Sequence, residues 1–314
     1  MSNIHVTSEI KTLKKVLLHR PGEELLNLTP ETLGELLFDD IPDLYEAQVE
    51  HDRFAKILSD NGVEVVYLED LMAETLDAHP EIKEQFLDQW LVESGVHTTE
   101  YHKIIKDYLA KFTNTKELVL KTMAGITFRE IGEIHTNFLV DRLETNSHLL
   151  VNPMPNLYFT RDPFASVGNG AVINRMYSVT RNRETIYADY IFRFHPEYAG
   201  NVPDLYGRNN HFHIEGGDVL NVNEKLLFIG ISQRTQAEAI QDLAMKMFYE
   251  NEGNKIETIL AFNIPNSRAF MHLDTVFTQI DTDAFTIHPG IMGTLQVFAL
   301  TADRANHDVH IEEH

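Results

Sequence analysis

The sequence of 314 residues predicts an α/β fold, and two observations carry this prediction. Near the N-terminus, residues 13–19 (LKKVLLH) have the composition of a buried strand, apolar residues recur at helical spacing over residues 42–61, and residues 63–68 (VEVVYL) are short and β-branched. After Val151 the chain returns to short strands and turns. Strands that alternate with helices are typical of α/β proteins.

Turn signals bound these elements. The first strand ends at an Arg-Pro-Gly turn, and the helix ends at Asn61-Gly62. In the second half, a predicted helix over residues 236–250 separates segments of strand composition: AVINRMYS, DVLNV, KLLFIGI, ETILAFNI and TVFTQI. Their recurrence predicts several similar βαβ-type units rather than one long parallel sheet. The last ten residues carry no turn or cap signal, so we expect an unstructured end with solvated histidines, His307, His310 and His314.

Between these two parts the character of the chain changes. From about residue 71 to residue 126 the apolar residues keep a helical period, as in Ile82, Phe86, Leu87, Trp90 and Leu91, with few strand signals. We predict a small helical subdomain over residues 71–131, inserted into an α/β framework formed by residues 1–70 and 132–314. Its helices look like ordinary amphipathic helices, which favours a structural role over a separate binding module.

The charge and the cysteine count narrow the function. The chain has 26 Lys and Arg against 48 Asp and Glu, a net charge of −22, so nucleic acid is a poor partner and a cationic small molecule a better one. It has no cysteine, which excludes disulfides, thiolate metal sites and a thiol nucleophile within these residues. The start lacks a signal pattern and no apolar run reaches the ~18 residues of a membrane span, so we expect no membrane partner and a cytoplasmic location.

Charged and polar residues gather in four segments that are otherwise apolar, where they cost free energy unless they are paired or used. These segments are 156–163 (NLYFTRDP), 181–184 (RNRE), 213–218 (HIEGGD) and 271–276 (MHLDTV), and Arg234 is an isolated residue of the same kind. The carboxylates among them, with one histidine and the arginines, form a set suited to binding a cation and moving protons: Asp162, Glu215, Asp218, Asp274 and His272.

Each segment also has a structural interpretation. His213 and Glu215 resemble a metal pair, but Gly216-Gly217 breaks the helix that an H-E-x-x-H site needs, so we expect no metal. An Asp before Pro, as at Asp162, is most often a turn residue. His272 and Asp274, two residues apart, would share a strand face as a structural hydrogen-bonded pair.

Taken in order, NLYFTRDP, TRNRET, IEGGDV, GISQRT and MHLDTVFT, preceded by LHRPG and LLFDDIP, closely resemble the bacterial arginine deiminases. The resemblance runs from about residue 4 to residue 300, with a weaker likeness to other guanidino-group-modifying enzymes. It implies a five-bladed α/β propeller (pentein-like), here C-terminally incomplete, with an inserted helical bundle. It also implies hydrolysis of L-arginine to L-citrulline and ammonia without a cofactor, by a chain that is homo-oligomeric when full length.

The resemblance also implies the roles of the catalytic residues. Asp162 and Asp274 would bind the two sides of the substrate guanidinium, a bidentate arrangement that suits a planar cation. His272 would protonate the departing ammonia and then activate water. Glu215 would hold the imidazole in its orientation.

The remaining implied roles concern substrate binding. Arg181 and Arg234, with Asn156 nearby, would bind the α-carboxylate, and Phe159 would line the slot. Asp218 would have a supporting role.

The chemistry of the family also requires a cysteine thiolate near the C-terminus, which forms a covalent thiouronium. No residue of this chain replaces it, because Ser and Thr are far weaker nucleophiles. We therefore expect that the sequence or the natural chain is truncated and inactive alone, and poorly soluble or partly molten. The alternatives are a non-catalytic arginine-binding or degenerate homologue and, ranked last, a metal-dependent hydrolase using His213 and His272.

Overall fold

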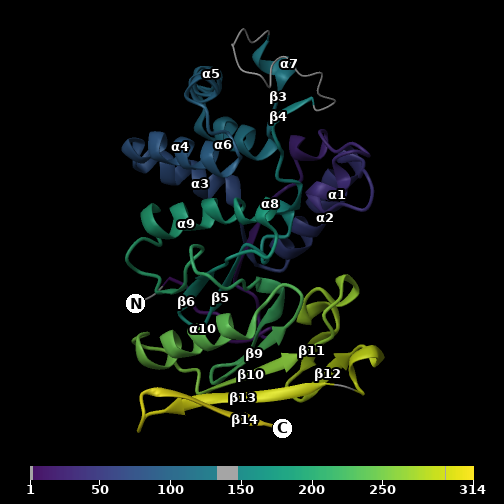
Figure 1. Ribbon diagram of the computed structural model, residues 1–314, viewed down its shortest axis with the longest axis vertical. Helices are drawn as coiled ribbons and strands as arrows, with labels where there is room; N and C mark the ends of the chain where they lie inside the picture. Colours follow the sequence, from purple (N-terminus) through teal and green to yellow (C-terminus); the bar gives the residue numbers. More distant parts are fainter. Residues whose placement is uncertain (1–2, 133–147, 294) are drawn as a thin grey trace. The chain divides into compact units, whose positions relative to one another are not determined.

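The computed structural model of the protein describes residues 3–132, 148–293 and 295–314, which form two compact units (Figure 1). The first unit contains Met1–Leu13, Arg161–Arg193 and Glu197–His314. The second contains Lys14–Thr160 and Phe194–Pro196. Helices and strands alternate in both units, so the predicted α/β class is confirmed.

The second unit opens with the predicted strand, helix and strand. β1 (Lys15–Leu18) pairs in parallel with β2 (Glu64–Tyr67), and α2 (Leu44–Asp60) connects them. Asp43 caps α2, because its side chain accepts a hydrogen bond from the backbone N–H of Glu46. The chain leaves the helix through Gly62, whose φ of 80° lies in the left-handed region that favours glycine.

The rest of this unit is mainly helical. Trp90, Ile105 and Leu118 come from three different helices and are excluded from solvent, and the Trp90 indole N–H donates to the carbonyl of Thr122 at 3.1 Å. The helices predicted over residues 71–131 belong to this unit together with β1 and β2. The remaining elements are η1 (Glu23–Leu25), α1 (Leu33–Leu36), α3 (Leu68–Ala78), η2 (Pro80–Ile82), α4 (Lys83–Glu93), α5 (Thr99–Leu109), α6 (Thr115–Ala124), β3 (Ile126–Thr127), α7 (Phe128–Ile131), β4 (Leu149–Val151) and η4 (Pro155–Tyr158).

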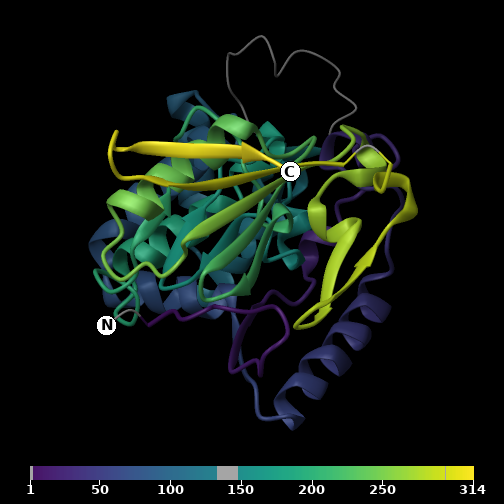
Figure 2. The same ribbon diagram turned by 90° about the horizontal axis from the view of Figure 1, so that it is seen from below.

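The largest sheet of the first unit has the order β14-β13-β10-β9-β8. β9 and β10 are parallel and α10 crosses between them, which is the predicted βαβ arrangement. Figure 2 shows β13 and β14 in yellow at one edge of this sheet. The bounds are β8 (Val219–Asn223), β9 (Leu226–Ile231), α10 (Ala237–Tyr249), β10 (Thr258–Asn263), β13 (Gln296–Asp303) and β14 (Asp308–Glu313).

Strand β14 corrects one prediction. The C-terminal residues are not unstructured, because Asp308–Glu313 pairs antiparallel with β13 along six residues. His307 has a φ of 55° in the turn before this strand, and its ring packs on Tyr249 with centroids 4.2 Å apart. A hairpin partner therefore orders a segment whose own composition gives no strand signal.

Two smaller sheets complete the first unit. In one, β6 pairs with β5 and β7, and in the other β11 pairs with β12. Phe228 and Phe262 of the large sheet pack on Phe277 and Phe285 of the β11–β12 pair, with ring centroids 5.4 to 5.9 Å apart. The bounds are β5 (Phe164–Val167), β6 (Gly170–Ile173), α8 (Val179–Asn182), α9 (Thr185–Phe194), β7 (Asp204–Tyr206), η5 (Gly216–Asp218), η6 (Arg268–Phe270), η7 (Leu273–Thr275), β11 (Phe277–Asp281), β12 (Ala284–Ile287) and η8 (Pro289–Ile291).

Within the described residues the strands form five separate sheets, and none of these sheets closes on itself. The strands thus do not form one long parallel sheet, as predicted, and the similarity of the βαβ-type units to one another stays a prediction. In the same part of the chain, no helix is both long and apolar enough to cross a membrane.

Candidate active site

A buried histidine–carboxylate pair forms the centre of the candidate site in the first unit. Nε2 of His272 lies 2.8 Å from Oε2 of Glu215, and the two residues are only 4% and 0% exposed. Each residue immediately precedes a short 3-10 helix, η7 or η5. Gly217 of η5 packs so closely on the imidazole that a Cβ at this position would lie 2.5 Å from Nδ1 of His272. Only glycine therefore leaves room for the ring in this orientation.

The surroundings of His272 favour its charged form. Burial lowers the pKa of the imidazole, but the hydrogen bond to Glu215 and the negative charges of Asp218, Asp162 and Glu215 outweigh burial and raise that pKa to about 9. Burial also opposes the charge of Glu215, but His272, Arg181 and Arg234 lower the pKa of this carboxyl below its usual value. At neutral pH the pair is an imidazolium and a carboxylate.

Glu215 has further donors besides His272. The backbone N–H of Tyr177 donates to Oε1 at 3.0 Å, and Nη1 of Arg234 donates to Oε2 at 3.2 Å. The guanidinium of Arg234 also lies 5.8 Å from the centre of the Tyr177 ring. Both carboxylate oxygens of Glu215 thus accept hydrogen bonds, which fixes the orientation of the carboxylate relative to His272.

Arg234 keeps hydrogen-bonding capacity that the described residues do not use. It is 7% exposed, its buried Nε has no partner in the described part of the chain, and Nη2 reaches only the sulfur of Met271 at 4.0 Å. A buried donor without an acceptor costs free energy. An anionic ligand would satisfy these donors without breaking an existing contact.

Asp162 lies beside the His272–Glu215 pair. One carboxylate oxygen of Asp162, one carboxylate oxygen of Glu215 and one ring nitrogen of His272 all lie within 4.8 Å of one another. The Asp162 backbone carbonyl accepts from the N–H of Gly216 at 3.2 Å, which holds the segment before β5 against η5. The long-range contact thus brings together two of the polar segments seen in the sequence.

Arg181 binds Asp162 on one side and Glu184 on the other. Its Nη1 donates to Oδ2 of Asp162 at 2.8 Å, and its Nε and Nη2 donate to Glu184 at 3.0 to 3.2 Å. The side chains of Arg181 and Glu184 are 4% and 2% exposed. The two carboxylates raise the pKa of Arg181 against the opposing effect of its burial, so the cation is permanent.

The group formed by Asp162, Glu215 and His272 has the size of a metal site, but its carboxylates already have hydrogen-bond partners. Oδ2 of Asp162 already accepts from Arg181, and Oε2 of Glu215 accepts from Arg234. Both of these oxygens are therefore already hydrogen-bonded to a guanidinium, and a metal ion could use them only by displacing these contacts.

Asp218 lies in the interior and has protein partners on both carboxylate oxygens. It accepts from the hydroxyls of Ser232 and Thr235, both at 2.6 Å, and from the backbone N–H of Leu273 at 2.7 Å. Burial raises the pKa of Asp218 to about 7, against the opposing charge of His272. The hydrogen bonds of Asp218 therefore connect the segment after β9 with Leu273, the residue that follows His272.

Asp274 lies in η7, two residues after His272. Loss of solvent around the carboxyl raises the pKa of Asp274, an effect that His272 opposes and the charge of Asp162 reinforces. No hydrogen bond to this carboxylate is formed among the residues that the structure describes. It is thus available to a ligand.

Two predicted binding residues belong to the other unit. Asn156 is 6% exposed and its amide donates to the carbonyl of Leu36 at 2.8 Å. Phe159 is 46% exposed, and its ring lies 4.0 Å from that of Tyr158 between centroids. Both are described within their own unit, so their roles at the His272 site stay predictions.

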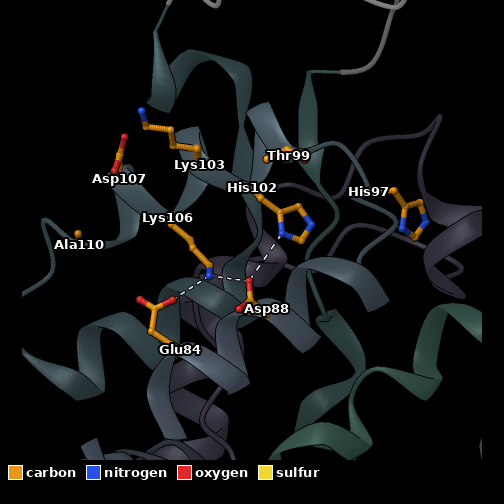
Figure 3. Close-up of a pocket in the computed structure, with 9 residues that line it drawn as sticks. All are labelled: Glu84, Asp88, His97, Thr99, His102, Lys103, Lys106, Asp107 and Ala110. Carbon is orange, nitrogen blue, oxygen red and sulfur yellow. Dashed lines mark hydrogen bonds and ion pairs between the residues drawn. The ribbon is translucent and has the colours of Figure 1, made fainter. Parts of the chain in front are cut away.

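A surface pocket of about 580 Å³ also lies in the second unit, lined by α4 and α5 (Figure 3). Lys106 points between Glu84 and Asp88 and binds both carboxylates, and His102 lies 3.7 Å from Asp88. These charges neutralise one another on an exposed helical surface, and such surface ion pairs contribute little free energy. The pocket lacks the buried acid–base pair of the first unit.

Two residues near the site received no role from the sequence. Glu184 is visible in the RNRE segment, but only the turn of α8 shows that it faces Arg181, three residues earlier. Tyr177 contributes its backbone N–H to Glu215, and a backbone donor leaves no signal in the side-chain pattern.

The sequence of this chain matches proteins of one family along most of its length. The profile of the family described as arginine deiminase matches residues 34–314. An arginine deiminase of Treponema denticola is 56% identical over 313 residues, which are 100% of this chain and 76% of the relative. An arginine deiminase of Streptococcus agalactiae is 53% identical over 99% of this chain and 75% of the relative. An arginine deiminase of Clostridium perfringens is 50% identical over 96% of this chain and 73% of the relative. The chain therefore spans about three quarters of the length of these relatives.

Solved structures give a weaker likeness. A dimethylarginine dimethylaminohydrolase adduct aligns with a TM-score of 0.43 and 15% identity, over 88% of this chain and 69% of that chain. An amidinotransferase from Microseira wollei aligns with a TM-score of 0.45 and 15% identity, over 92% and 72%. The family follows from the sequence matches alone: this chain belongs to the arginine deiminase family.

Proposed function

We propose that this chain provides the substrate-binding and proton-transfer residues of an enzyme that hydrolyses L-arginine to L-citrulline and ammonia. The observation that carries the proposal is the buried imidazolium–carboxylate pair of His272 and Glu215 beside Asp162. A cationic acid enclosed by carboxylates is suited to protonating a leaving amine next to a bound guanidinium.

Each residue then has a chemical task. Asp162 and Asp274 bind the guanidinium of the substrate through charge-assisted hydrogen bonds. His272 donates its proton to the departing ammonia, becomes neutral, and accepts a proton from the water that completes the hydrolysis. Nδ1, which has no partner in the described part of the chain, is the ring nitrogen that remains for this exchange, because Nε2 is bound to Glu215.

The covalent step requires a nucleophile that these residues lack. A thiolate attacks the guanidinium carbon, and cleavage of a C–N bond with loss of ammonia leaves a covalent thiouronium; water then attacks the same carbon, which releases citrulline and regenerates the thiolate. No cysteine occurs among the 314 residues. We propose that turnover needs a cysteine supplied from outside this sequence and that the chain alone is inactive.

The unpaired Nε of Arg234 among the described residues supports a role of this arginine in binding the α-carboxylate. The roles of Asn156 and Phe159 as further substrate contacts rest on the family resemblance. We also propose that the small sheets are parts of a five-bladed propeller, that residues 71–131 are an inserted bundle, and that the protein works in the cytoplasm as a homo-oligomer.

Binding and turnover experiments test the proposal separately. Calorimetric titration with L-arginine should detect binding to this chain, and Asp162→Asn should weaken it. Citrulline release should appear only when the chain is joined to the C-terminal segment of the Treponema denticola relative. A non-catalytic arginine-binding protein, the second candidate, predicts binding but no citrulline release from the joined chain. Failure to bind arginine in a folded sample would contradict both.

A further inference from the structure

The guanidinium of Arg181 occupies the carboxylate proposed to bind the guanidinium of the substrate. Nη1 of Arg181 lies 2.8 Å from Oδ2 of Asp162, with the two side chains 4% and 14% exposed. Arg181 and the substrate present the same chemical group. Two guanidinium cations repel each other and cannot use one oxygen with the same geometry, so the substrate competes with Arg181 for Asp162.

Glu184 holds the other edge of the same guanidinium. It accepts from Nε at 3.2 and 3.1 Å and from Nη2 at 3.0 Å. Burial raises the pKa of Glu184, while the charge and hydrogen bonds of Arg181 oppose that rise. Because two of its three nitrogens are bound to Glu184, Arg181 can release Asp162 through Nη1 and still remain paired.

The second predicted carboxylate-binding arginine is in a different state. Arg234 has a buried Nε without a partner among the described residues, whereas every guanidinium nitrogen of Arg181 has a carboxylate acceptor. An anion can bind Arg234 without breaking a contact. For Arg181 to bind the same anion, the contact with Asp162 must break.

We propose that Arg181, held by Glu184, is hydrogen-bonded through Nη1 to Asp162 in the unliganded protein. This hydrogen bond breaks only when the α-carboxylate of the substrate replaces Asp162 as the acceptor of Nη1. This inference rests on the proposed function, which assigns Asp162 to the substrate guanidinium. Glu184 and Arg181 are then specificity-determining residues. A guanidinium compound without a carboxylate binds more weakly for two reasons. It makes no carboxylate contact with the arginines, and it must displace Arg181 from Asp162 without giving Nη1 of Arg181 a new acceptor.

The test compares the dissociation constants of L-arginine and agmatine, which lacks the carboxylate, by calorimetry. The variant Arg181→Met/Glu184→Gln removes both charges of the buried pair together, which avoids leaving one of them uncompensated. We expect agmatine to bind roughly tenfold more tightly than to the unmodified chain, while L-arginine binds more weakly. Arg193→Met, which removes a half-exposed ion pair with Asp189, is the matched control and should change neither constant.

A second measurement needs no variant. Propionate, which supplies a carboxylate, should tighten agmatine binding to the unmodified chain, and the double variant should lose this effect. Equal weakening of both ligands in the double variant, or no effect of propionate on the unmodified chain, would overturn the inference while leaving the proposed function intact. If the folded, unmodified chain bound neither ligand, the proposed function itself would be wrong.

Discussion

Oε2 of Glu215 accepts hydrogen bonds from both Nε2 of His272, at 2.8 Å, and Nη1 of Arg234, at 3.2 Å. One carboxylate oxygen therefore joins the proposed acid to the proposed carboxylate-binding cation. The arrangement keeps His272 charged and leaves the buried Nε of Arg234 without a partner among the described residues. This relationship makes the site sensitive to changes at Glu215.

Glu215→Gln should lower the pKa of His272. The amide removes the negative charge and the strong acceptor that hold this pKa at about 9, while the burial that lowers it remains. The titration of His272, followed by NMR of the labelled imidazole, should shift by at least about one pH unit towards lower pH. An unchanged titration midpoint in a folded variant would show that Glu215 does not stabilise the imidazolium.

The same pair should make stability depend on pH. The pKa of His272 is raised from 6.5 to about 9 on folding, so its contribution is complete below pH 6.5 and is lost as the pH rises to 9. The free energy of unfolding, measured with urea, should therefore fall between pH 6.5 and 9. His272→Gln should remove this part of the slope, and an identical slope in the variant would contradict the assignment.

Asp218→Asn should remove a different slope. Burial raises the pKa of Asp218 from 3.8 to about 7, so the stability associated with its protonated form is present below pH 3.8 and is lost as the pH rises to 7. The variant should show a flatter dependence of the unfolding free energy in this window. It should also shift the NMR signals of His272, because Asp218 accepts from the N–H of Leu273.

Gly217→Ala should displace the imidazole. The new Cβ would lie 2.5 Å from Nδ1 of His272, closer than real contacts allow, so the ring must rotate or the loop must move. We expect a loss of roughly 1–3 kcal/mol in stability and a changed His272 titration. Gly207→Ala is the control, since a Cβ there meets nothing within 4 Å, and a wild-type titration in the Gly217 variant would contradict the packing described.

The local elements were predictable because their signals are local. The strand, helix and strand of residues 13–68 are present, with the helix ending where Asn61-Gly62 indicates. Strand β14 was not predicted, because it depends on pairing with β13 rather than on its own composition. The boundaries of the two units were likewise inaccessible, since they reflect contacts between segments far apart in the sequence.

The candidate site was predictable to a similar extent. The clustering of charged residues in apolar segments identified Asp162, Glu215 and His272, which the fold brings within 4.8 Å of one another. The sequence did not predict that Arg181 would bind Asp162, because that contact depends on how α8 directs the side chain. The sequence also gave no role to Glu184, although Glu184 lies only three residues after Arg181.

In the proposed function these residues bind arginine and transfer protons, and the nucleophile is a cysteine that the 314 residues do not contain. The most direct measurement is citrulline release from L-arginine by the chain alone, by the chain joined to the C-terminal segment of the Treponema denticola relative, and by the joined chain with His272→Ala. We expect citrulline release only in the second sample. Citrulline release by the chain alone, or an inactive joined protein that is folded and binds arginine, would contradict this expectation.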